Sequence, residues 1–387
     1  MLTFRKALII AAVLISLILF LRSSSSSSPS PSPLASPQEK TAYGISQSTK
    51  EKPAIHDAEP QQQQQQQTTK KPPLPPPTAP LRERLRYHFS YNLEAKFPAY
   101  IWQTWKYTPA SLWFSQDLRK PEASWTELNP SFVHQVIPDD TLHHLIKYLY
   151  GSIPEVFEAF DSMPIPVLKA DFFRYLILLA RGGIYSDIDT TALKPVVDWL
   201  PDGLDLSTVG FVVGIEADPD RPDWHDWYSR RIQFCQWTIQ SKPGHPILID
   251  IVSYITEEAL RMKKAGILKK GKMDKTIVEF TGPAAWTDAI FRYFNDPEYF
   301  AIEPGSTKNI TYEDFTNQVA YQKVGDVMVL PITSFSPGVQ QMGAQDVDDP
   351  MAFVKHDFEG WFSMTCVFAD LADGFFFLGT WKTDPNL

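Results

Sequence analysis

The sequence predicts an α/β fold, in which strands and helices alternate through one large domain. Two observations carry this prediction. Apolar and aromatic residues are plentiful from about Tyr87 onward, enough for a large core. In the same region, short apolar segments typical of strands alternate with segments of helical periodicity. We find no internal repeat and nothing that marks a second domain in the 387 residues.

The N-terminal part is expected to be an anchor and a stem. Residues 1–6 carry Arg5 and Lys6, and residues 7–21 form an apolar run whose one polar residue is Ser16. Counted from Leu2, this run is long enough for a spanning helix, and the preceding positive charges favour a cytoplasmic tail. A cleaved signal peptide is the alternative. An anchor places the remainder in a lumen.

Residues 22–85 are of low complexity, with SSSSSSPSPSP, QQQQQQQ and KKPPLPPP in succession. Such stretches bury too little apolar surface to offset chain entropy, and their prolines keep them extended. They are typical of a disordered stem. If these stretches lay in the cytosol, they would instead suit the role of ligands for proline-binding modules. The folded domain is accordingly expected at 86–387.

Charge and cysteine content narrow the class of protein. The formal net charge is −9 and the pI is about 5.4, which argues against a nucleic-acid partner. Two cysteines, Cys235 and Cys366, have a spacing that excludes a cysteine zinc site. An oxidising lumen would allow them to pair, but spacing alone does not show that they meet.

The expected elements follow one another in a strand and helix alternation. The apolar, aromatic run 98–105 predicts a strand, and 132–137 predicts a second one. Asp139 and Asp140 begin a helix that Gly151 ends. Residues 164–183 begin with proline, run apolar at helical spacing and end in two glycines. Further strands are expected at 209–216 and 327–337.

The stretch RGGIYSDIDT, residues 181–190, is the strongest candidate for a functional site. After Gly183 we expect a strand, in which Tyr185, Asp187 and Asp189 share one face, with Ile184 and Ile188 opposite. Two neighbouring carboxylates repel each other, and a divalent cation such as Mg²⁺ or Mn²⁺ resolves the repulsion. The cation can in turn hold a diphosphate. The alternative is a purely structural role, in which the two carboxylates cap a loop.

Two further charged residues accompany this stretch. Asp171 and Arg174 lie three residues apart, so they share one face of an otherwise apolar helix. They suit a structural ion pair, and they equally suit contacts with sugar hydroxyls beside a metal. A different class also matches, because DIDTT fits the pattern of phosphatases with an aspartyl nucleophile, with DVDDP (346–350) as the later acidic pair. In those phosphatases the motif ends an early strand, whereas in this sequence a helix and two glycines precede it.

Several blocks together resemble a known family. They are YIWQTWK, LKADFFRYLILLARGGIYSDIDTTALKP, QWTIQSKPGHPIL, TGPAAWTDAIF, ITSFSPG and VDDPMAFVKHDFEGWF. In this order they resemble signatures of the fungal initiation-specific α-1,6-mannosyltransferases of glycosyltransferase family 32, which are Golgi type II membrane enzymes. The similarity runs through most of residues 97–368. The anchor and stem agree with it independently.

The resemblance implies a GT-A fold, a nucleotide-sugar-binding α/β domain that uses Mn²⁺ or another divalent cation through its Asp-x-Asp motif. GDP-mannose is then the donor, and the acceptor is the core N-linked glycan of glycoproteins, which receives the first α-1,6-mannose of the outer chain. An α-linked donor and product imply retention. We expect front-face attack, in which Arg174 and the metal stabilise the leaving diphosphate.

The resemblance also assigns residues. Asp187, Asp189 and His356 are implied as metal ligands, and the first two also hold the diphosphate; Asp187, Asp189 and Arg174 are the catalytic set. The implied donor contacts are Ile101, Trp102 and Gln103 at the nucleotide base, and Asp171, Arg174, Tyr185 and Ser186 nearer the sugar. One departure is Glu359-Gly360-Trp361, where the family has Glu-Gly-Ser/Thr-Trp, so the contacts of this tail with the diphosphate are in doubt. Asn309 begins the one usable glycosylation sequon.

Two other functions stay open. A relative that mannosylates a sphingolipid headgroup or a later outer-chain residue shares these motifs, although a lipid-modifying relative would be expected to carry further membrane spans, and no later apolar run is long enough. A non-catalytic subunit of a mannan-synthesising complex is the alternative from another class. The intact Asp187 and Asp189 argue against it.

Overall fold

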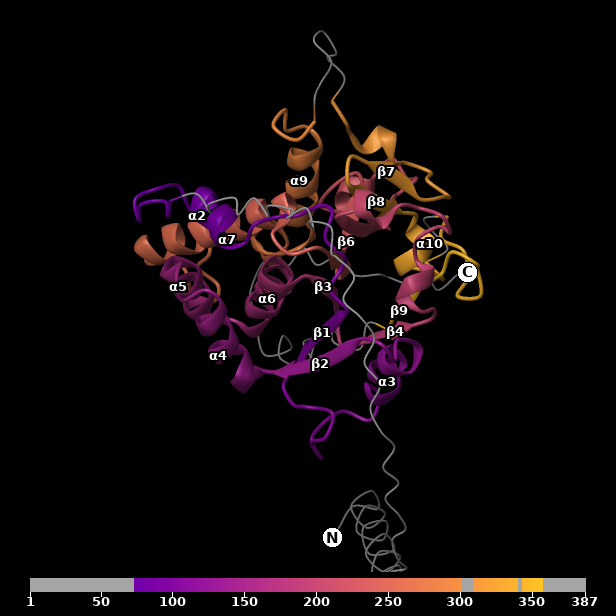
Figure 1. Ribbon diagram of the computed structural model, residues 1–387, viewed down its shortest axis with the longest axis horizontal. Coiled ribbons are helices and arrows are strands. Elements are labelled where there is room, and N and C mark those ends of the chain that lie inside the picture. The colour runs from indigo at the N-terminus through magenta and orange to yellow at the C-terminus, as the bar shows by residue number, and fades with distance from the viewer. Residues whose placement is uncertain (1–72, 301–308, 340–342, 358–387) are drawn as a thin grey trace, which may run out of the picture. The chain divides into compact units, whose positions relative to one another are not determined.

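The computed structural model describes residues 73–300, 309–339 and 343–357 (Figure 1). The chain divides into two units, Met1–Lys70 and Lys71–Leu387, and the first lies wholly outside the described residues, as do the expected anchor and most of the expected stem. Among the described helices, none is long and apolar enough to cross a membrane.

The boundary expected between the stem and the domain, at residues 85 and 86, is wrong. Helix α2, Leu81–His88, spans it. Leu81 and Leu85 lie in the main hydrophobic core, because the apolar positions of this helix are four residues apart and therefore share one face. The folded part thus includes residues that composition assigned to the stem.

A mixed sheet of seven strands forms the centre of the domain, in the order β2-β1-β3-β6-β5-β8-β7. Strands β2, β1 and β3 are mutually parallel, β6 is antiparallel to both β3 and β5, β8 is parallel to β5, and β7 is antiparallel to β8. A separate two-stranded sheet joins β4 and β9. The strands are β1 Tyr100–Trp105, β2 Val133–Pro138, β3 Gly183–Ser186, β4 Thr190–Ala192, β5 Phe211–Ala217, β6 Gln233–Ser241, β7 Gln322–Val324, β8 Val327–Leu330 and β9 Val354–His356.

Helices cover both faces of the sheet (Figure 1). They are α2, α3 Arg119–Leu128, α4 Asp139–Leu149, α5 Pro154–Ser162, α6 Pro166–Arg181, α7 Pro246–Lys264, α8 Ile277–Phe280, α9 Pro283–Phe294 and α10 Ile332–Phe335, with short 3₁₀ turns at Val196–Asp198, Leu206–Thr208, Trp224–Asp226 and Tyr312–Asp314. One core packs α2, α4 to α7 and α9 against the sheet. A second core joins the other face to α3, α10, β4 and β9.

Alternation along the strands explains why two cores form. In β1, Ile101 enters one core and Trp102 the other, and in β3 Ile184 and Tyr185 divide in the same way. Successive side chains of a strand point to opposite faces. A sheet covered on both faces therefore reads as a continuous apolar run, as these strands do.

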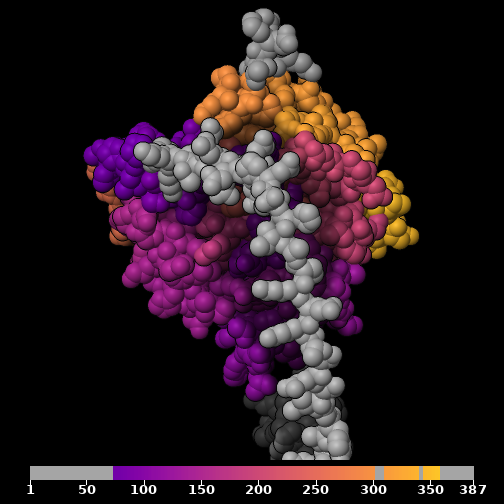
Figure 2. All heavy atoms as spheres, viewed as in Figure 1, coloured from indigo at the N-terminus to yellow at the C-terminus, as the bar shows by residue number. Residues whose placement is uncertain are grey.

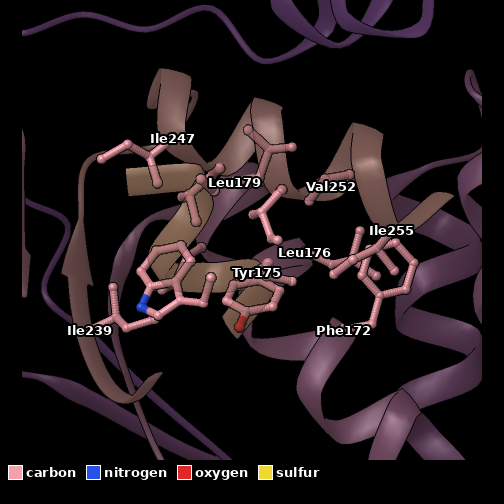
Figure 3. Close-up of a cluster of buried hydrophobic side chains, with 14 of the residues drawn as sticks. Phe172, Tyr175, Leu176, Leu179, Ile239, Ile247, Val252 and Ile255 are labelled. Carbon is pink, nitrogen blue, oxygen red and sulfur yellow. The ribbon is translucent and has the colours of Figure 1, made fainter. Parts of the chain in front are cut away.

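Helix α6 is the buried centre of the larger core. Pro166 begins it, and Gly182 ends it with a φ of 63°. Figure 3 shows Leu176 and Leu179 of this helix among side chains of α7 that include Val252 and Ile255. Because α6 runs directly into β3, its packing fixes the start of the strand that carries the candidate site.

The two glycines between α6 and β3 are required by the close approach of neighbouring chain. Gly183 has a φ of 94°, and a Cβ atom there would lie 2.6 Å from the carbonyl oxygen of Tyr100. At Gly182 a Cβ atom would lie 2.8 Å from the carbonyl oxygen of Ser241. Any side chain would therefore push β3 away from its neighbours.

The expected strands at 98–105, 132–137 and 209–216 are confirmed as β1, β2 and β5, and the expected helices as α4 and α6. The strand expected at 327–337 is too long. Strand β8 ends at Leu330, and α10 begins directly after Pro331, which has no N–H for a strand ladder and suits a helix start.

The C-terminal segments return to the central strands. Strand β8 pairs with β5, and β9 pairs with β4. Figure 2 shows these late segments, coloured orange to yellow, directly beside the rose-coloured residues of the middle of the chain. This return brings residues from distant parts of the sequence to the end of β3. Cys235 is buried, and Cys366 lies outside the described residues.

Candidate active site

The candidate site is a turn at the end of β3. Contrary to expectation, the strand ends at Ser186, and Ile188 and Asp189 form a turn before β4 begins at Thr190. Tyr185 and Asp187 still meet, since the Tyr185 hydroxyl donates to Asp187 Oδ1 across 2.7 Å. A turn, rather than a continued strand, is what brings both carboxylates to one place.

Hydrogen bonds to the main-chain atoms of this turn fix its shape. The carbonyl oxygen of Asp187 accepts from Gln103 Nε2 at 3.0 Å, from Thr190 Oγ1 at 2.5 Å and from Thr190 N at 3.2 Å. The Asp187 N–H donates to the carbonyl oxygen of Trp237 in β6. Trp125 of α3 donates from Nε1 to the carbonyl oxygen of Thr190. Strands β1 and β6 thus hold the turn from both sides.

The third residue of the site arrives on β9. His356 pairs with Thr190 across the two-stranded sheet, and its Nε2 lies 3.7 Å from Asp189 Oδ1. The N–H of Asp357 donates to the carbonyl oxygen of Asp189 across 2.8 Å. The His356 ring also packs edge-on against Trp237. The expected meeting of His356 with the Asp-x-Asp motif is therefore present.

Asp187, Asp189 and His356 have the composition and spacing of a divalent-cation site. One potential ligand atom from each residue lies within 4.8 Å of the others. A cation with bonds of roughly 2.1 Å joins ligands roughly 3 to 4 Å apart, so a small side-chain adjustment closes the set. Carboxylate oxygens with one imidazole suit Mn²⁺. The residues fit the metal that the motif implies.

Arg174 links the helix α6 to this cluster. Its Nη2 lies 3.1 Å from Asp171 Oδ1 and 3.2 Å from Asp187 Oδ1. Its side chain is only 5% exposed, as is that of Asp171. Burial raises the pKa of Asp171 to about 6 although the Arg174 charge opposes the rise. Burial likewise raises the pKa of Asp187, against the charge of Arg174.

The positive charge that acts most strongly on Asp187 in the described part of the chain is that of Arg174, and His356 acts in the same direction. The repulsion expected between the two carboxylates is therefore reduced at Asp187 by a basic neighbour. Asp189 has a different neighbour, His356. The arrangement divides the motif into one carboxylate held by an arginine and one that faces the histidine.

The Ser186 side chain points into the protein. Its hydroxyl lies 2.7 Å from Thr190 Oγ1 and 2.8 Å from Thr238 Oγ1, and the residue is fully buried. This hydroxyl holds the turn. Tyr185 is also buried, and burial raises the pKa of its hydroxyl well above the ordinary range, so it remains a proton donor to Asp187.

The stretch expected at a nucleotide base does not offer an exposed surface. Ile101 and Gln103 are fully buried, and Trp102 is nearly so. Trp102 Nε1 donates to the carbonyl oxygen of Gly182. Gln103 uses both ends of its amide, with Nε2 on Asp187 and Oε1 on His134. These side chains support β3 and its turn, and a contact of this strand end with a nucleotide base stays a prediction.

Two residues of the site were not predicted. Thr281 donates from Oγ1 to Asp171 Oδ2 across 2.8 Å, so the TGPAAW segment positions Asp171. Glu216 of β5 lies close enough to Arg174 for the arginine charge to act on its carboxyl. A hydroxyl beside a Gly-Pro helix start was a usable signal for Thr281, whereas nothing local marks Glu216.

The remaining expected positions lie apart from Asp187, Asp189 and His356 or outside the described residues. Asn309 is exposed, at the start of the segment 309–339, as a glycosylation acceptor must be. The altered tail at Glu359-Gly360-Trp361 lies outside the described residues.

The fold and the site define a glycosyltransferase with an Asp-x-Asp motif: the family described as "Glycosyltransferase sugar-binding region containing DXD motif" matches residues 115–204. Over 291 residues, the chain is 48% identical to an "Initiation-specific alpha-1,6-mannosyltransferase" of Candida albicans, with 72% of this chain and 76% of that protein covered. A protein of the same name from Schizosaccharomyces pombe is 46% identical over 276 residues, which cover 71% of this chain and 66% of that protein. The chain belongs to the family of the initiation-specific α-1,6-mannosyltransferases.

One solved structure shows a distant likeness to this chain. The "PaToxG Glycosyltransferase" overlays with a TM-score of 0.36 at 17% identity, covering 57% of this chain and 78% of that one.

Proposed function

We propose that this chain is a metal-dependent, retaining α-1,6-mannosyltransferase with a GT-A fold, which moves mannose from GDP-mannose onto a core N-linked glycan and so begins a fungal outer chain. The observation that carries the proposal is the convergence of Asp187, Asp189 and His356 within 4.8 Å, beside the ion pair of Arg174 with Asp171. The 48% identity to a protein of that name supports the reaction class.

In this proposal Asp187, Asp189 and His356 hold Mn²⁺ or another divalent cation. The cation supplies charge that neutralises the departing diphosphate. Tyr185 keeps the carboxylate of Asp187 oriented through its 2.7 Å hydrogen bond. Asp171, itself held by Thr281, fixes the guanidinium of Arg174 at the site, where its charge stabilises the diphosphate and its donors meet sugar hydroxyls.

The retaining course follows from the linkage, because an α-linked donor gives an α-linked product. We propose front-face attack, in which the acceptor oxygen bonds to the anomeric carbon of mannose on the face from which the diphosphate leaves, and a diphosphate oxygen takes the proton of the acceptor hydroxyl. Among the protein's own side chains, Arg174 supplies the positive charge that balances the negative charge on the departing diphosphate.

The proposal also includes the location of the protein in the cell. We propose a single-pass type II protein of the Golgi membrane, with a tail at 1–6, an anchor at 7–21, a stem that ends before α2, and a lumenal catalytic domain that works alone or within a mannosyltransferase complex. A lumenal domain fits the exposed Asn309 sequon. Its glycosylation is part of the proposal.

The test uses the full-length chain, purified in detergent, with GDP-mannose, Mn²⁺ and a high-mannose N-glycan. Mass spectrometry and α-1,6-mannosidase digestion then identify the product. We expect one added mannose that the mannosidase removes, and no product after chelation. The matched pair of variants is Asp187→Ala, which should abolish transfer, and Asp202→Ala, an exposed aspartate that should leave it unchanged.

Other results would redirect the assignment. Hydrolysis of GDP-mannose without transfer would keep the donor and reject the acceptor, and inositol phosphoceramide would then be tried in its place. No use of GDP-mannose under any of these conditions would reject the catalytic function and favour a non-catalytic subunit.

A further inference from the structure

Two charged side chains near the Asp-x-Asp turn keep polar atoms without a partner. Arg174 is buried, and its Nη2 serves both Asp171 and Asp187. Its Nε and Nη1 are buried with no hydrogen-bond partner. The charge of Arg174 acts on the hydroxyls of Tyr175 and Tyr185. Neither hydroxyl meets Nε or Nη1 of Arg174 with hydrogen-bond geometry.

Glu216 is the second of these side chains. It lies near the end of β5, where β5 meets β6 with an irregular register around Ala217 and Gln233. Gln233 hydrogen-bonds to its carboxyl group, while the oxygen Oε2 is buried without a partner. A carboxylate in this position needs an explanation, because an unpartnered buried polar atom lowers the stability of a fold.

The two sets of orphan atoms are chemically complementary, since one set consists of donors and the other is an acceptor. The charge of Arg174 acts on the carboxyl of Glu216, yet no ion pair joins them within the described part of the chain, although Arg174 pairs with two other carboxylates. Two donor atoms of Arg174 and one acceptor atom of Glu216 are thus left without hydrogen-bond partners. A hydroxyl group both donates and accepts a hydrogen bond, so neighbouring hydroxyls of a sugar satisfy both sets.

We propose that Glu216 is a sugar-binding residue of this transferase: its Oε2 accepts a hydrogen bond from a hydroxyl of the transferred hexose, whose other hydroxyls accept from Nε and Nη1 of Arg174. This inference rests on the proposed function and extends it by a residue from β5. It leaves the diphosphate to the metal site and Arg174.

The surroundings of Glu216 agree with this role. Burial raises the pKa of its carboxyl to about 8, and the nearby charge of Arg174 opposes that rise. Tyr228 and Cys235 are its other titratable neighbours, and the pKa of each is raised in part by the carboxylate. None of them supplies a cation, so in the described part of the chain Arg174 is the one positive group that acts on it.

The experiment compares GDP with GDP-mannose, because only the second carries the hexose. Calorimetric titration of the full-length chain in detergent, with Mn²⁺ present, gives both affinities for wild type, Glu216→Ala and Glu216→Gln. We expect Glu216→Ala to weaken GDP-mannose binding about tenfold, which corresponds to the loss of one hydrogen bond, and to leave GDP binding unchanged. Glu216→Gln keeps the shape and one acceptor oxygen, so its loss is smaller.

Glu257→Ala is the control, since Glu257 is exposed on α7, and it should change neither affinity. Equal loss of GDP and GDP-mannose binding would show that Glu216 only supports the fold and would overturn the proposal, as would unchanged affinities. If Glu216→Ala does not fold, the ratio of the two affinities in Glu216→Gln decides, and an unchanged ratio rejects the role. Failure of the wild-type chain to bind GDP-mannose while it binds GDP rejects the proposed donor instead, whatever the variants do.

Discussion

Gln103 Nε2 of β1 donates to the main-chain carbonyl oxygen of Asp187 across 3.0 Å, so the neighbouring strand holds the turn that carries Asp187 and Asp189. The other end of the same amide meets His134 Nε2 at 2.9 Å. Burial lowers the pKa of His134 to about 4, which keeps its ring neutral near pH 7. A buried chain of hydrogen bonds from β2 through β1 therefore ends at the site.

Replacing Gln103 with leucine should loosen this turn without removing a ligand. We expect the Mn²⁺ concentration for half-maximal transfer to rise about tenfold and the free energy of unfolding to fall by about 1–3 kcal/mol, because His134 Nε2 loses its hydrogen-bond partner. Metal titration of the transfer rate and urea unfolding measure the two effects. Gln135→Leu on the exposed face of β2 is the control. An unchanged metal requirement in Gln103→Leu would contradict the role of the turn.

The glycine between α6 and β3 provides a matched stability test. Gly183→Ala should lower the free energy of unfolding by about 3 kcal/mol or more, because its positive φ is strained for alanine and its Cβ would meet the Tyr100 carbonyl oxygen. Gly203 also has a positive φ, of 79°, but open space around it, so Gly203→Ala should lower stability by only about 1 kcal/mol. Equal losses, measured by urea unfolding, would show that the close approach is unimportant.

Stability should depend on pH through Glu216. Its folded pKa of about 8 lies above the ordinary value, so the native state holds a proton that the unfolded state releases. Its contribution to stability is complete below about pH 4.5 and is lost as the pH rises through 8. We therefore expect the stability of Glu216→Gln relative to wild type to increase by about 1–4 kcal/mol between pH 5 and pH 8. Urea unfolding at both values checks this, and a difference independent of pH would show that the carboxyl is not desolvated.

The sequence predicted the elements well where local pattern determines them. The apolar runs of β1, β2 and β5 and the proline and glycine limits of α6 are local signals. Pro331 was read as part of a strand although a proline seldom continues one, and α10 begins there instead. The stem boundary failed because composition changes gradually, whereas Leu81 and Leu85 are buried by contacts with residues far along the chain.

The site was predicted as far as its motif extends. Asp187 and Asp189 follow from their spacing, and the pairing of Asp171 with Arg174 follows from helical geometry. The roles of Gln103 and Glu216 depend on the order of strands, which places β1 on one side of β3 and β6 with β5 on the other. Nothing in the sequence near either residue specifies that order. His356 was reached by resemblance alone, because its neighbour Thr190 is set by the pairing of β4 with β9.

The dependence of mannose transfer on a divalent cation is the decisive test of the site formed by Asp187, Asp189 and His356. Transfer of mannose from GDP-mannose is measured against Mn²⁺ concentration for the full-length wild type, Asp189→Ala and His356→Ala, with Asp202→Ala as the control. We expect Asp189→Ala to lower the rate at least about a hundredfold, His356→Ala to raise the Mn²⁺ requirement about tenfold or more, and the control to transfer mannose as wild type does. Transfer by Asp189→Ala at the wild-type rate, or wild-type transfer that persists after chelation, would contradict the proposed metal site.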